Sequence, residues 1–373
     1  MKKRLIPFAA LGLLSVIATS CGSGKTWAWD TAIEDKELGY IILVGEDGNP
    51  EAEDRTKGCV EALNEIAKEG GFTAKELERK TCIDTNGNSW NDQAAKEFVE
   101  LCVTKYGDQL DFIVSNNDGM AIAAAGVTSL AKGTPIIGFD ALSAACDMIK
   151  AGTLAGSVSQ NGDDQALLTA VVLGNLLKGQ TDYTKVTTGY NGKAELNLES
   201  AEDHILQTKF AAVTKANADS LKPGSYVDVK EDSALKGKKM LVATYSNNDN
   251  FIKETYRAAL PHYAEALGFE VEVIEGDGTN DKDLVERLQT KVSEFKPDCV
   301  ALNVITHSNY ESYLSAVGDI PTVFFNRQPK NSNNEGVADL SDLDKVYFVG
   351  SGSTGQGTAQ GQIIKDWYHA LEK

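Results

Sequence analysis

Carboxylates, amides and a guanidinium recur just after the apolar runs of this sequence. Asn117 follows DFIVSN, Asp140 follows PIIGF, and Asp249 lies three residues after MLVATYS. A buried hydroxyl group must both donate and accept hydrogen bonds, and side chains of these types supply both kinds of partner. The pattern therefore indicates a site for a small ligand that carries several hydroxyl groups. The candidate residues are Asn49, Glu51, Arg55, Asn116, Asn117, Asp118, Asp140, Gln160, Asp249, Phe251, Asn326 and Arg327.

Each of these residues also has a simpler explanation. Asn and Asp are common at helix N-caps and in turns, so one such residue on its own identifies no site. A binding site is favoured because the group follows several expected strands, and open α/β sheets bind their ligands at the carboxyl ends of the strands.

Motifs for catalysis, metal binding and nucleotide binding are weak. GSGKT (22–26) lacks the first glycine of a phosphate-binding loop, because position 19 is Thr, and no strand precedes it. GSGSTG (350–355) matches GxGxxG, but the second strand of a dinucleotide site does not follow it. The sequence has no GxSxG or HExxH, and its histidines show no metal-ligand spacing; they are His204, His262, His307 and His369.

Short apolar runs alternate with helical patterns in both halves of the chain. This alternation is typical of βαβ units and predicts two α/β lobes with parallel sheets flanked by helices. Residues 180–237 separate the halves and show one convincing strand, 209–214. The other expected strands are 39–44, 111–117, 134–140, 154–159, 240–246, 270–276, 299–304, 322–326 and 345–351, and the expected helices include 51–68, 164–177, 250–266, 281–294, 308–316 and 355–371.

The first 20 residues have the form of an export signal. A basic stretch, Met1 to Arg4, precedes an apolar stretch, 5–18, that is too short to span a bilayer stably. Small residues then precede Cys21, which resembles a bacterial lipobox in which this cysteine is lipidated and becomes the N-terminus. The alternative is an ordinary signal peptide with an incidental cysteine. We expect an exported, lipid-anchored protein with residues 21–38 as a tether.

Charge and cysteine content limit the function further. The formal net charge is −18, and it becomes −21 once the three basic residues of the signal are removed. Such an acidic surface repels phosphate backbones, which argues against nucleic acid as a partner. The other five cysteines lack CxxC spacing, so buried free thiols are expected rather than disulfides or a metal site; they are Cys59, Cys82, Cys102, Cys146 and Cys299.

Several blocks of the sequence resemble the galactose/glucose-binding proteins of the type I periplasmic-binding-protein fold, the sugar receptors of ABC transporters. IVSNNDGMAIAA and PIIGFDALSAACDMIKAGTLAGSVSQ resemble the second lobe of that family, and YSNNDNF, VFFNRQP and KVYFVGS resemble its first lobe. The second-lobe blocks come first in this chain. The resemblance therefore implies a two-lobed fold in a circularly permuted order.

The resemblance also implies a role for each matching polar residue. Asp249 matches the residue that accepts from the sugar 4-hydroxyl, and Arg55 matches an arginine near the ring oxygen. Asn117 and Asp140 match a pair on the side of the 2- and 3-hydroxyls, and Asn326 matches an asparagine of the first lobe. Aromatic rings on either face of a pyranose would cover its apolar C–H faces.

The resemblance also covers two aromatic residues, while three polar positions differ from the family. Trp90 and Phe251 match the rings that stack on the sugar. Asn49, Glu51 and Gln160 stand where the family has His, Asp and Asn, so they keep hydrogen-bonding groups but change their reach. TAIEDKELG (31–39) replaces the calcium loop of the family and lacks the alternating oxygen ligands that Ca²⁺ requires, so no metal and no cofactor is expected.

These inferences divide the chain as follows. Residues 1–20 form the signal and 21–38 the tether. One lobe comprises 39–158, 209–221 and 355–373, the other comprises 161–195 and 238–350, and 222–237 joins the old termini at the surface. The chain is expected to cross between the lobes at about 159–161, 195–208 and 351–354.

The expected function is that of a monomeric, extracytoplasmic receptor that binds D-glucose or D-galactose and delivers it to an ABC transporter permease. A chemoreceptor is a second candidate partner. The alternatives are a receptor for another small sugar, such as a pentose, a surface adhesin, or a sugar-acting enzyme that uses Asp140, Asp249 and Glu51. An enzyme is disfavoured because two rings around one pyranose are expected to leave no space for a leaving group.

Overall fold

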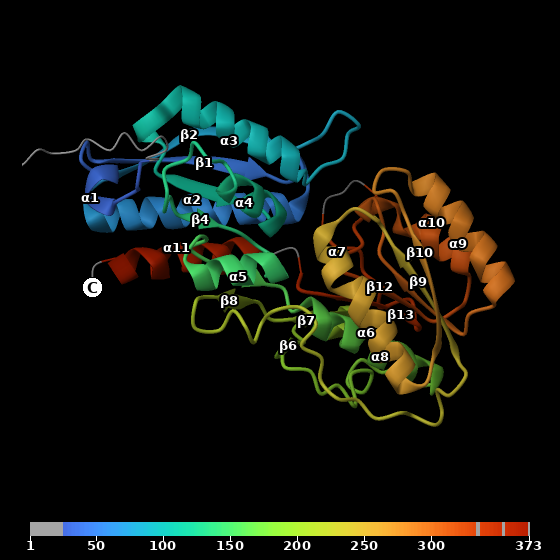
Figure 1. Ribbon diagram of the computed structural model, residues 1–373. Coiled ribbons are helices and arrows are strands. Elements are labelled where there is room, and N and C mark those ends of the chain that lie inside the picture. The colour runs from blue at the N-terminus through green and yellow to red at the C-terminus, as the bar shows by residue number, and fades with distance from the viewer. Residues whose placement is uncertain (1–24, 333–335, 353–354, 372–373) are drawn as a thin grey trace, which may run out of the picture.

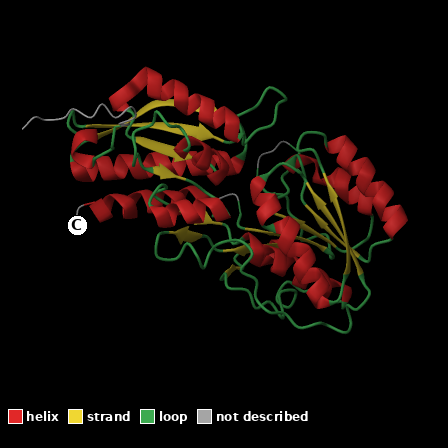
Figure 2. Cartoon of the chain, viewed as in Figure 1, coloured by secondary structure: helices red, strands yellow, loops and turns green. Residues whose placement is uncertain are grey.

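The computed structural model describes residues 25–332, 336–352 and 355–371. These residues form two α/β lobes that lie side by side (Figures 1 and 2). The predicted export signal and Cys21 lie outside the described residues. Within the described ranges, no helix is both long enough and apolar enough to cross a membrane.

The first lobe is built on a four-stranded parallel sheet in the order β2-β1-β3-β4. Its strands are β1 (Glu37–Val44), β2 (Thr73–Thr81), β3 (Phe112–Ser115) and β4 (Ile136–Ile137). A short antiparallel pair, β5 (Ser157–Ser159) and β8 (Ala211–Val213), continues the lobe beyond β4 through a bridge between Ile137 and Gly156. Its helices are α1 (Trp29–Ala32), α2 (Pro50–Gly70), α3 (Asp92–Tyr106), α4 (Asp118–Ala125), α5 (Ser143–Ala151) and α11 (Gln356–Leu371).

The second lobe is built on a seven-stranded sheet in the order β10-β9-β11-β12-β13-β7-β6, in which only β6 runs antiparallel to its neighbour. The strands are β6 (Leu196–Asn197), β7 (Ile205–Thr208), β9 (Lys239–Thr244), β10 (Glu270–Glu275), β11 (Cys299–Leu302), β12 (Thr322–Phe325) and β13 (Val346–Gly350). The helices are α6 (Gly162–Leu177), α7 (Asn250–Glu254), α8 (Tyr256–Leu267), α9 (Asp281–Phe295) and α10 (Tyr310–Val317).

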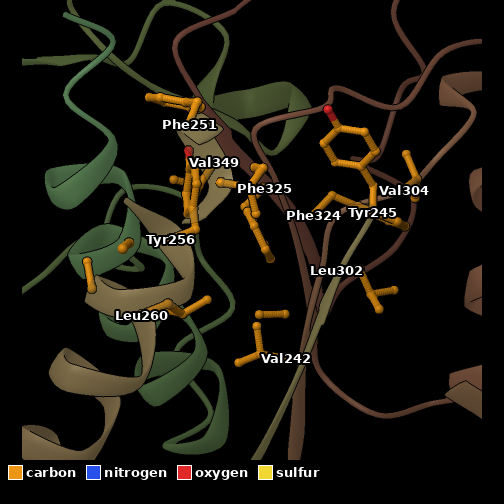
Figure 3. Packing of buried hydrophobic residues seen from close by; sticks show 14 of the residues in the cluster. Val242, Tyr245, Phe251, Tyr256, Leu260, Leu302, Val304, Phe324, Phe325 and Val349 are labelled. Atoms are coloured by element: carbon orange, nitrogen blue, oxygen red, sulfur yellow. The ribbon is translucent and has the colours of Figure 1, made fainter. Parts of the chain in front are cut away.

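The core of the second lobe forms where α8 lies against its sheet (Figure 3). Tyr256 and Leu260 of α8 face Val242 of β9 and Phe325 of β12, and all four side chains are fully buried. Full burial of an apolar side chain of this size contributes about 1.5–3 kcal/mol. The apolar runs that predicted the strands therefore supply the packing that holds the carboxyl ends of those strands in place.

The last helix of the chain belongs to the first lobe. Helix α11 lies alongside α2 (Figure 1), and the two backbones approach closely at Gly58 and Gly357. A Cβ atom on Gly357 would lie 1.9 Å from the carbonyl oxygen of Asp54, so no larger residue fits there without a backbone shift. The first and last described residues thus lie in the same lobe, and most of the residues between Gly162 and Gly350 form the other.

The predicted tether is partly folded, which corrects the expectation for residues 21–38. Trp27 packs against Trp367 with ring centroids 5.9 Å apart, and Trp29 packs against Tyr368 at 5.5 Å. Strand β1 then begins at Glu37. The physical reason is the aromatic content of the segment, because these rings cover the end of α11 rather than remaining in water.

The segment between the halves is also more ordered than predicted. Strands β6 and β7 join the sheet of the second lobe, so the crossing expected at 195–208 falls after Thr208 instead. Within the supposed surface joiner 222–237, Leu235 is only 2% exposed and the ring of Tyr226 stacks on His262 at 4.3 Å. Because most residues of this segment are polar, the sequence did not predict that these few apolar residues would be packed.

Two smaller expectations also have outcomes in the structure. The helix predicted over 250–266 is divided into α7 and α8 at Thr255, whose φ of −108° and ψ of −92° are not helical. The five cysteines after Cys21 are buried and unpaired, which confirms the prediction of free thiols.

We predict that Leu235→Ala lowers the free energy of unfolding by about 2–4 kcal/mol, because it leaves a cavity beside Gly174 in the packed joiner. Urea denaturation followed by circular dichroism would measure this change. Lys236→Ala, on the exposed neighbour, is the control. Equal stability of the Leu235→Ala variant and the unmodified protein would show that the joiner is not part of the core.

Candidate functional site

The carboxyl ends of the strands of both lobes meet around one small cavity of about 60 Å³. The ten residues that the family resemblance assigned to the sugar all line it, and so do Tyr245 and Arg327. Asn116 and Asp118 are buried behind it instead. The lining residues are Asn49, Glu51, Arg55, Trp90, Asn117, Asp140, Gln160, Tyr245, Asp249, Phe251, Asn326 and Arg327.

Arg55 is fixed in the wall of the first lobe by three contacts. Its Nε donates to Oε1 of Gln356 at 2.6 Å, and its Nη1 donates to the carbonyl oxygen of Asn116 at 2.6 Å. Its guanidinium lies 3.6 Å from the ring centroid of Phe139. Burial lowers the pKa of Arg55, while the carboxylate of Asp140 acts in the opposite direction. Because Gln356 lies on α11, the last helix of the chain orients a side chain of the site.

Asp140 is the buried acceptor of the first lobe. Its Oδ1 accepts from Nε2 of Gln160 at 2.6 Å and lies 3.8 Å from Nη1 of Arg55. Burial raises the pKa of Asp140 to about 7, even though Arg55 and Gln160 favour the charged form. The site therefore holds a carboxyl group that a hydroxyl donor would help to ionise.

The two asparagines of the first lobe are helix caps as well as wall residues. Oδ1 of Asn49 accepts from the backbone N–H groups of Glu51 and Ala52 at the start of α2. Oδ1 of Asn117 accepts from the N–H of Met120 at the start of α4. The simple N-cap explanation is thus correct for both residues, and Nδ2 of Asn49 also donates to Oε2 of Glu46 at 3.2 Å.

Trp90 lies across the backbone of Gly45. A Cβ atom on Gly45 would lie 2.1 Å from the indole ring, so only glycine permits this placement. The indole nitrogen donates to Oε2 of Glu46 at 3.2 Å. Trp90 also adopts a positive φ of 57°, which is uncommon for a bulky residue. Its ring is therefore held in a defined orientation at the edge of the cavity.

Asp249 is the matching acceptor of the second lobe. Its Oδ1 caps α7 by accepting from the N–H of Ile252 at 2.8 Å, and its Oδ2 accepts from the hydroxyl of Tyr245 at 2.6 Å. Phe251, two residues later, is 6% exposed at the same wall. Asn303 positions the side-chain amide of Asn326, because Nδ2 of Asn303 donates to Oδ1 of Asn326 at 3.2 Å.

Arg327 and Glu46 connect the two lobes across the site. The guanidinium of Arg327 lies 3.8 Å from the ring centroid of Tyr245, and its Nη2 is 3.6 Å from Oε2 of Glu46 in the first lobe. The sequence placed Arg327 after a strand but gave no reason to select Tyr245 or Glu46. The sequence feature that could have identified them is their position after a strand. Tyr245 directly follows β9, and Glu46 lies two residues after the end of β1.

A second cavity of about 640 Å³ opens directly beside the small one. Five residues line both spaces, namely Trp90, Asn117, Tyr245, Asp249 and Arg327. The expectation that the aromatic rings leave no space next to a bound pyranose stays a prediction. Trp90 and Tyr245 line both spaces, whereas Phe251 lines the inner cavity alone.

No group of three or more His, Cys, Asp and Glu side chains within residues 25–332, 336–352 and 355–371 is arranged to hold a metal ion. The lack of a calcium site remains a prediction.

Two parts of the chain match models of known protein families. Residues 16–181 match a model described as a periplasmic binding protein domain, and residues 237–310 match a second model with the same description. Both parts are therefore similar to periplasmic binding protein domains. The predicted two-lobed α/β fold with parallel sheets is confirmed, whereas the permuted order remains a prediction.

Two curated relatives and one solved structure are similar to this chain. The chain is 35% identical over 199 residues to the D-galactose/methyl-galactoside binding periplasmic protein MglB of Haemophilus influenzae, a match that covers 52% of this chain and 54% of the relative. It is 25% identical over 168 residues to a xylitol-binding protein of Mycolicibacterium smegmatis, covering 44% and 45%. The chain thus spans about half the length of the curated relatives it matches.

The structure of GanP, a glucose-galactose binding protein from Geobacillus stearothermophilus, covers 90% of this chain and 91% of its own. Its TM-score is 0.52 and its sequence identity is 10%, so this likeness concerns the fold alone.

We predict that Asp140→Asn changes the free energy of unfolding, relative to the unmodified protein, in a way that depends on pH. Without ligand, this change should be more stabilising at pH 8 than at pH 4 by about 1–3 kcal/mol. The pKa of Asp140 is raised to about 7 in the folded state, against about 3.9 when unfolded, so the folded state binds more protons between these values. The Asp140 side chain therefore lowers stability as the pH rises from about 4 to 8, and Asn removes this loss.

Urea unfolding of both proteins at several pH values would measure the difference. Asp228→Asn, at an exposed position, is the control. A stability difference between Asp140→Asn and the unmodified protein that stays constant with pH would contradict the account of Asp140.

Proposed function

We propose that this protein is an extracytoplasmic receptor that binds D-glucose or D-galactose between its two lobes. The observation that carries this proposal is the composition of the inner cavity, which combines three carboxylates, four side-chain amides and aromatic rings from both lobes. A pyranose has apolar faces and a polar rim, and this lining complements both.

In this proposal the sugar ring lies between Trp90 of the first lobe and Phe251 of the second. Asp140 and Asn117 bind hydroxyls from one side, and Asp249 and Asn326 bind them from the other. A hydrogen bond to a charged group contributes about 1.5–3 kcal/mol, so the two carboxylates supply much of the affinity. Because the ligand contacts both lobes at once, it binds the closed form more tightly than the open one.

The small inner volume supports a closing motion. The 60 Å³ cavity is below the roughly 300–1,000 Å³ of typical ligand pockets, because Gln160 and Arg55 converge on Asp140. A hexose must therefore enter an opened cleft and displace these contacts. Another small sugar remains the alternative ligand, since one relative is named a xylitol-binding protein and Asn49, Glu51 and Gln160 alter the ends of the site.

We propose that Cys21 is lipidated and that the protein is anchored outside the cytoplasm as a monomer. The closed form delivers the sugar to the permease of an ABC transporter, and a chemoreceptor is a further partner. Support comes from the similarity to MglB, named as a periplasmic protein, and from the lipobox-like residues before Cys21.

We also propose that the two lobes are circularly permuted relative to the family. Helix α11 at the end of the chain packs on α2 near its beginning, and the segment 180–237 links the lobes where the old termini would lie. The lobes also share a detail that suggests equivalent starts. Asn116 accepts from the N–H of Gly45 after β1, and Asn303 accepts from the N–H of Tyr245 after β9.

We predict that calorimetric titration with D-glucose, D-galactose, D-xylose and D-ribose shows one-to-one binding of at least one hexose, with the sugar recovered unchanged. Asp249→Ala should weaken this binding at least about tenfold, because it removes a charged acceptor. Asp366→Ala, on the exposed face of α11, should leave it unchanged. Absence of hexose binding, or chemical conversion of the sugar, would refute the receptor function.

A rearranged chain tests the permutation. Residues 222–373 followed by a short flexible spacer and residues 25–221 restore the family order, and they retain both the packed joiner and the Trp27–Trp29 cluster. The spacer need only join ends that lie near each other, since Tyr368 contacts Trp29. We expect a cooperatively folded protein that binds the same hexose within about threefold of the unmodified affinity. Folding without binding would show that the lobes do not form one site in that order.

A further inference from the structure

The outer cavity is too large and too polar to be explained by one hexose. Its volume of about 640 Å³ lies within the range of sites that hold whole small ligands. Residues from both lobes form its walls, so closure of the lobes would enclose part of whatever lies in it. The inner cavity, at about 60 Å³, is a small side compartment of this space.

The two cavities form one continuous path. Asn117 of the first lobe and Asp249 of the second border both, and the rings of Trp90 and Tyr245 extend from one into the other. A hydroxyl of the inner sugar that points between Asn117 and Asp249 therefore points into the outer cavity. A substituent on that hydroxyl would continue along the same path.

The outer cavity is lined by acidic side chains that already have partners within the protein. Glu46 faces Arg327, Asp84 accepts from Asn88, Asp92 accepts from Asn250, and Asp277 accepts from the N–H of Thr279. These hydrogen bonds occupy part of the acceptor capacity of the carboxylates and hold the side chains in place.

Neutral groups carry the unused hydrogen-bonding capacity of the outer cavity. Within the described part of the chain, the side chains of Ser89, Asn248 and Thr306 make no hydrogen bond. They come from both lobes and supply donors and acceptors, the same combination that serves hydroxyl groups in the inner site.

We propose that the outer cavity binds the second ring of a disaccharide whose first ring occupies the inner site. This inference rests on the proposed function of the inner site. It adds that the ligand range extends beyond monosaccharides. The linkage is set by the hydroxyl that points between Asn117 and Asp249, so disaccharides of one linkage bind and those of other linkages do not.

The test is a calorimetric titration with monosaccharides and with disaccharides of glucose and galactose, covering 1→2, 1→3, 1→4 and 1→6 linkages. At least one disaccharide should bind one-to-one and compete with the monosaccharide. The double variant Asn248→Ala and Thr306→Val should weaken disaccharide binding roughly tenfold and leave monosaccharide binding unchanged, since it removes contacts to the second ring alone.

Two further variants sharpen the result. Ser89→Trp fills the outer cavity and should abolish disaccharide binding while the monosaccharide still binds. Thr290→Val, on exposed helix α9, is the matched control for Thr306→Val and should change neither affinity.

Each outcome decides the matter. Monosaccharide binding without binding of any disaccharide overturns the inference and leaves the proposed function intact. Disaccharide binding that the outer-cavity variants do not weaken also overturns it, because the second ring then lies elsewhere. If no monosaccharide binds, the proposed function fails and the inference fails with it.

Discussion

The burial of carboxylates between two lobes is the constraint on which this structure depends. A carboxylate removed from water is unfavourable unless hydrogen bonds and opposite charges compensate. Asp140 has Arg55 and Gln160, and even so burial raises its pKa to about 7. Asp249 has the hydroxyl of Tyr245, and the ring of Tyr245 carries the guanidinium of Arg327. The carboxylates of the site are therefore held by hydrogen bonds and charges from neighbouring side chains, and within the described residues one buried oxygen of the cavity lining, Oε2 of Glu51, has no hydrogen-bond partner.

The same network reaches the connections between the lobes. Gln160 donates to Asp140 through Nε2, while its Oε1 accepts from the hydroxyl of Ser351 at 3.0 Å. Its carbonyl oxygen accepts from the hydroxyl of Thr208 at 3.1 Å. Gln160, Thr208 and Ser351 each lie at or next to the end of a strand where the chain passes from one lobe to the other. A ligand that takes the Gln160 amide or the Asp140 carboxylate into its own hydrogen bonds acts directly on the hinge, which couples binding to closure.

The sequence identified many of the residues that line the inner cavity, because the ends of its strands are easy to find. Apolar runs such as PIIGF and TVFF fix where a strand stops, and the polar residue that follows must then lie at the carboxyl edge of a parallel sheet. Asp140 and Asn326 were found in this way. Glu46 escaped notice because one turn, GEDGNP, holds several equivalent polar residues, and only the folded structure shows which of them meets Arg327 of the other lobe.

Features that depend on a few apolar residues within polar surroundings were predicted less well. Leu235 and Tyr226 anchor a segment whose polar composition suggests a loop. Trp27 and Trp29 pack against α11, although their segment was expected to be a tether. The open space beside the inner cavity could not be predicted either. It is set by the distance between two lobes, and no local sequence pattern encodes that distance.

The most direct test of the central claim is a crystal structure of the protein with D-glucose or D-galactose. The account predicts one pyranose between the rings of Trp90 and Phe251, with a hydroxyl oxygen within about 3 Å of each of Asp140 and Asp249. A sugar bound to one lobe only, or bound away from these two carboxylates, would contradict it.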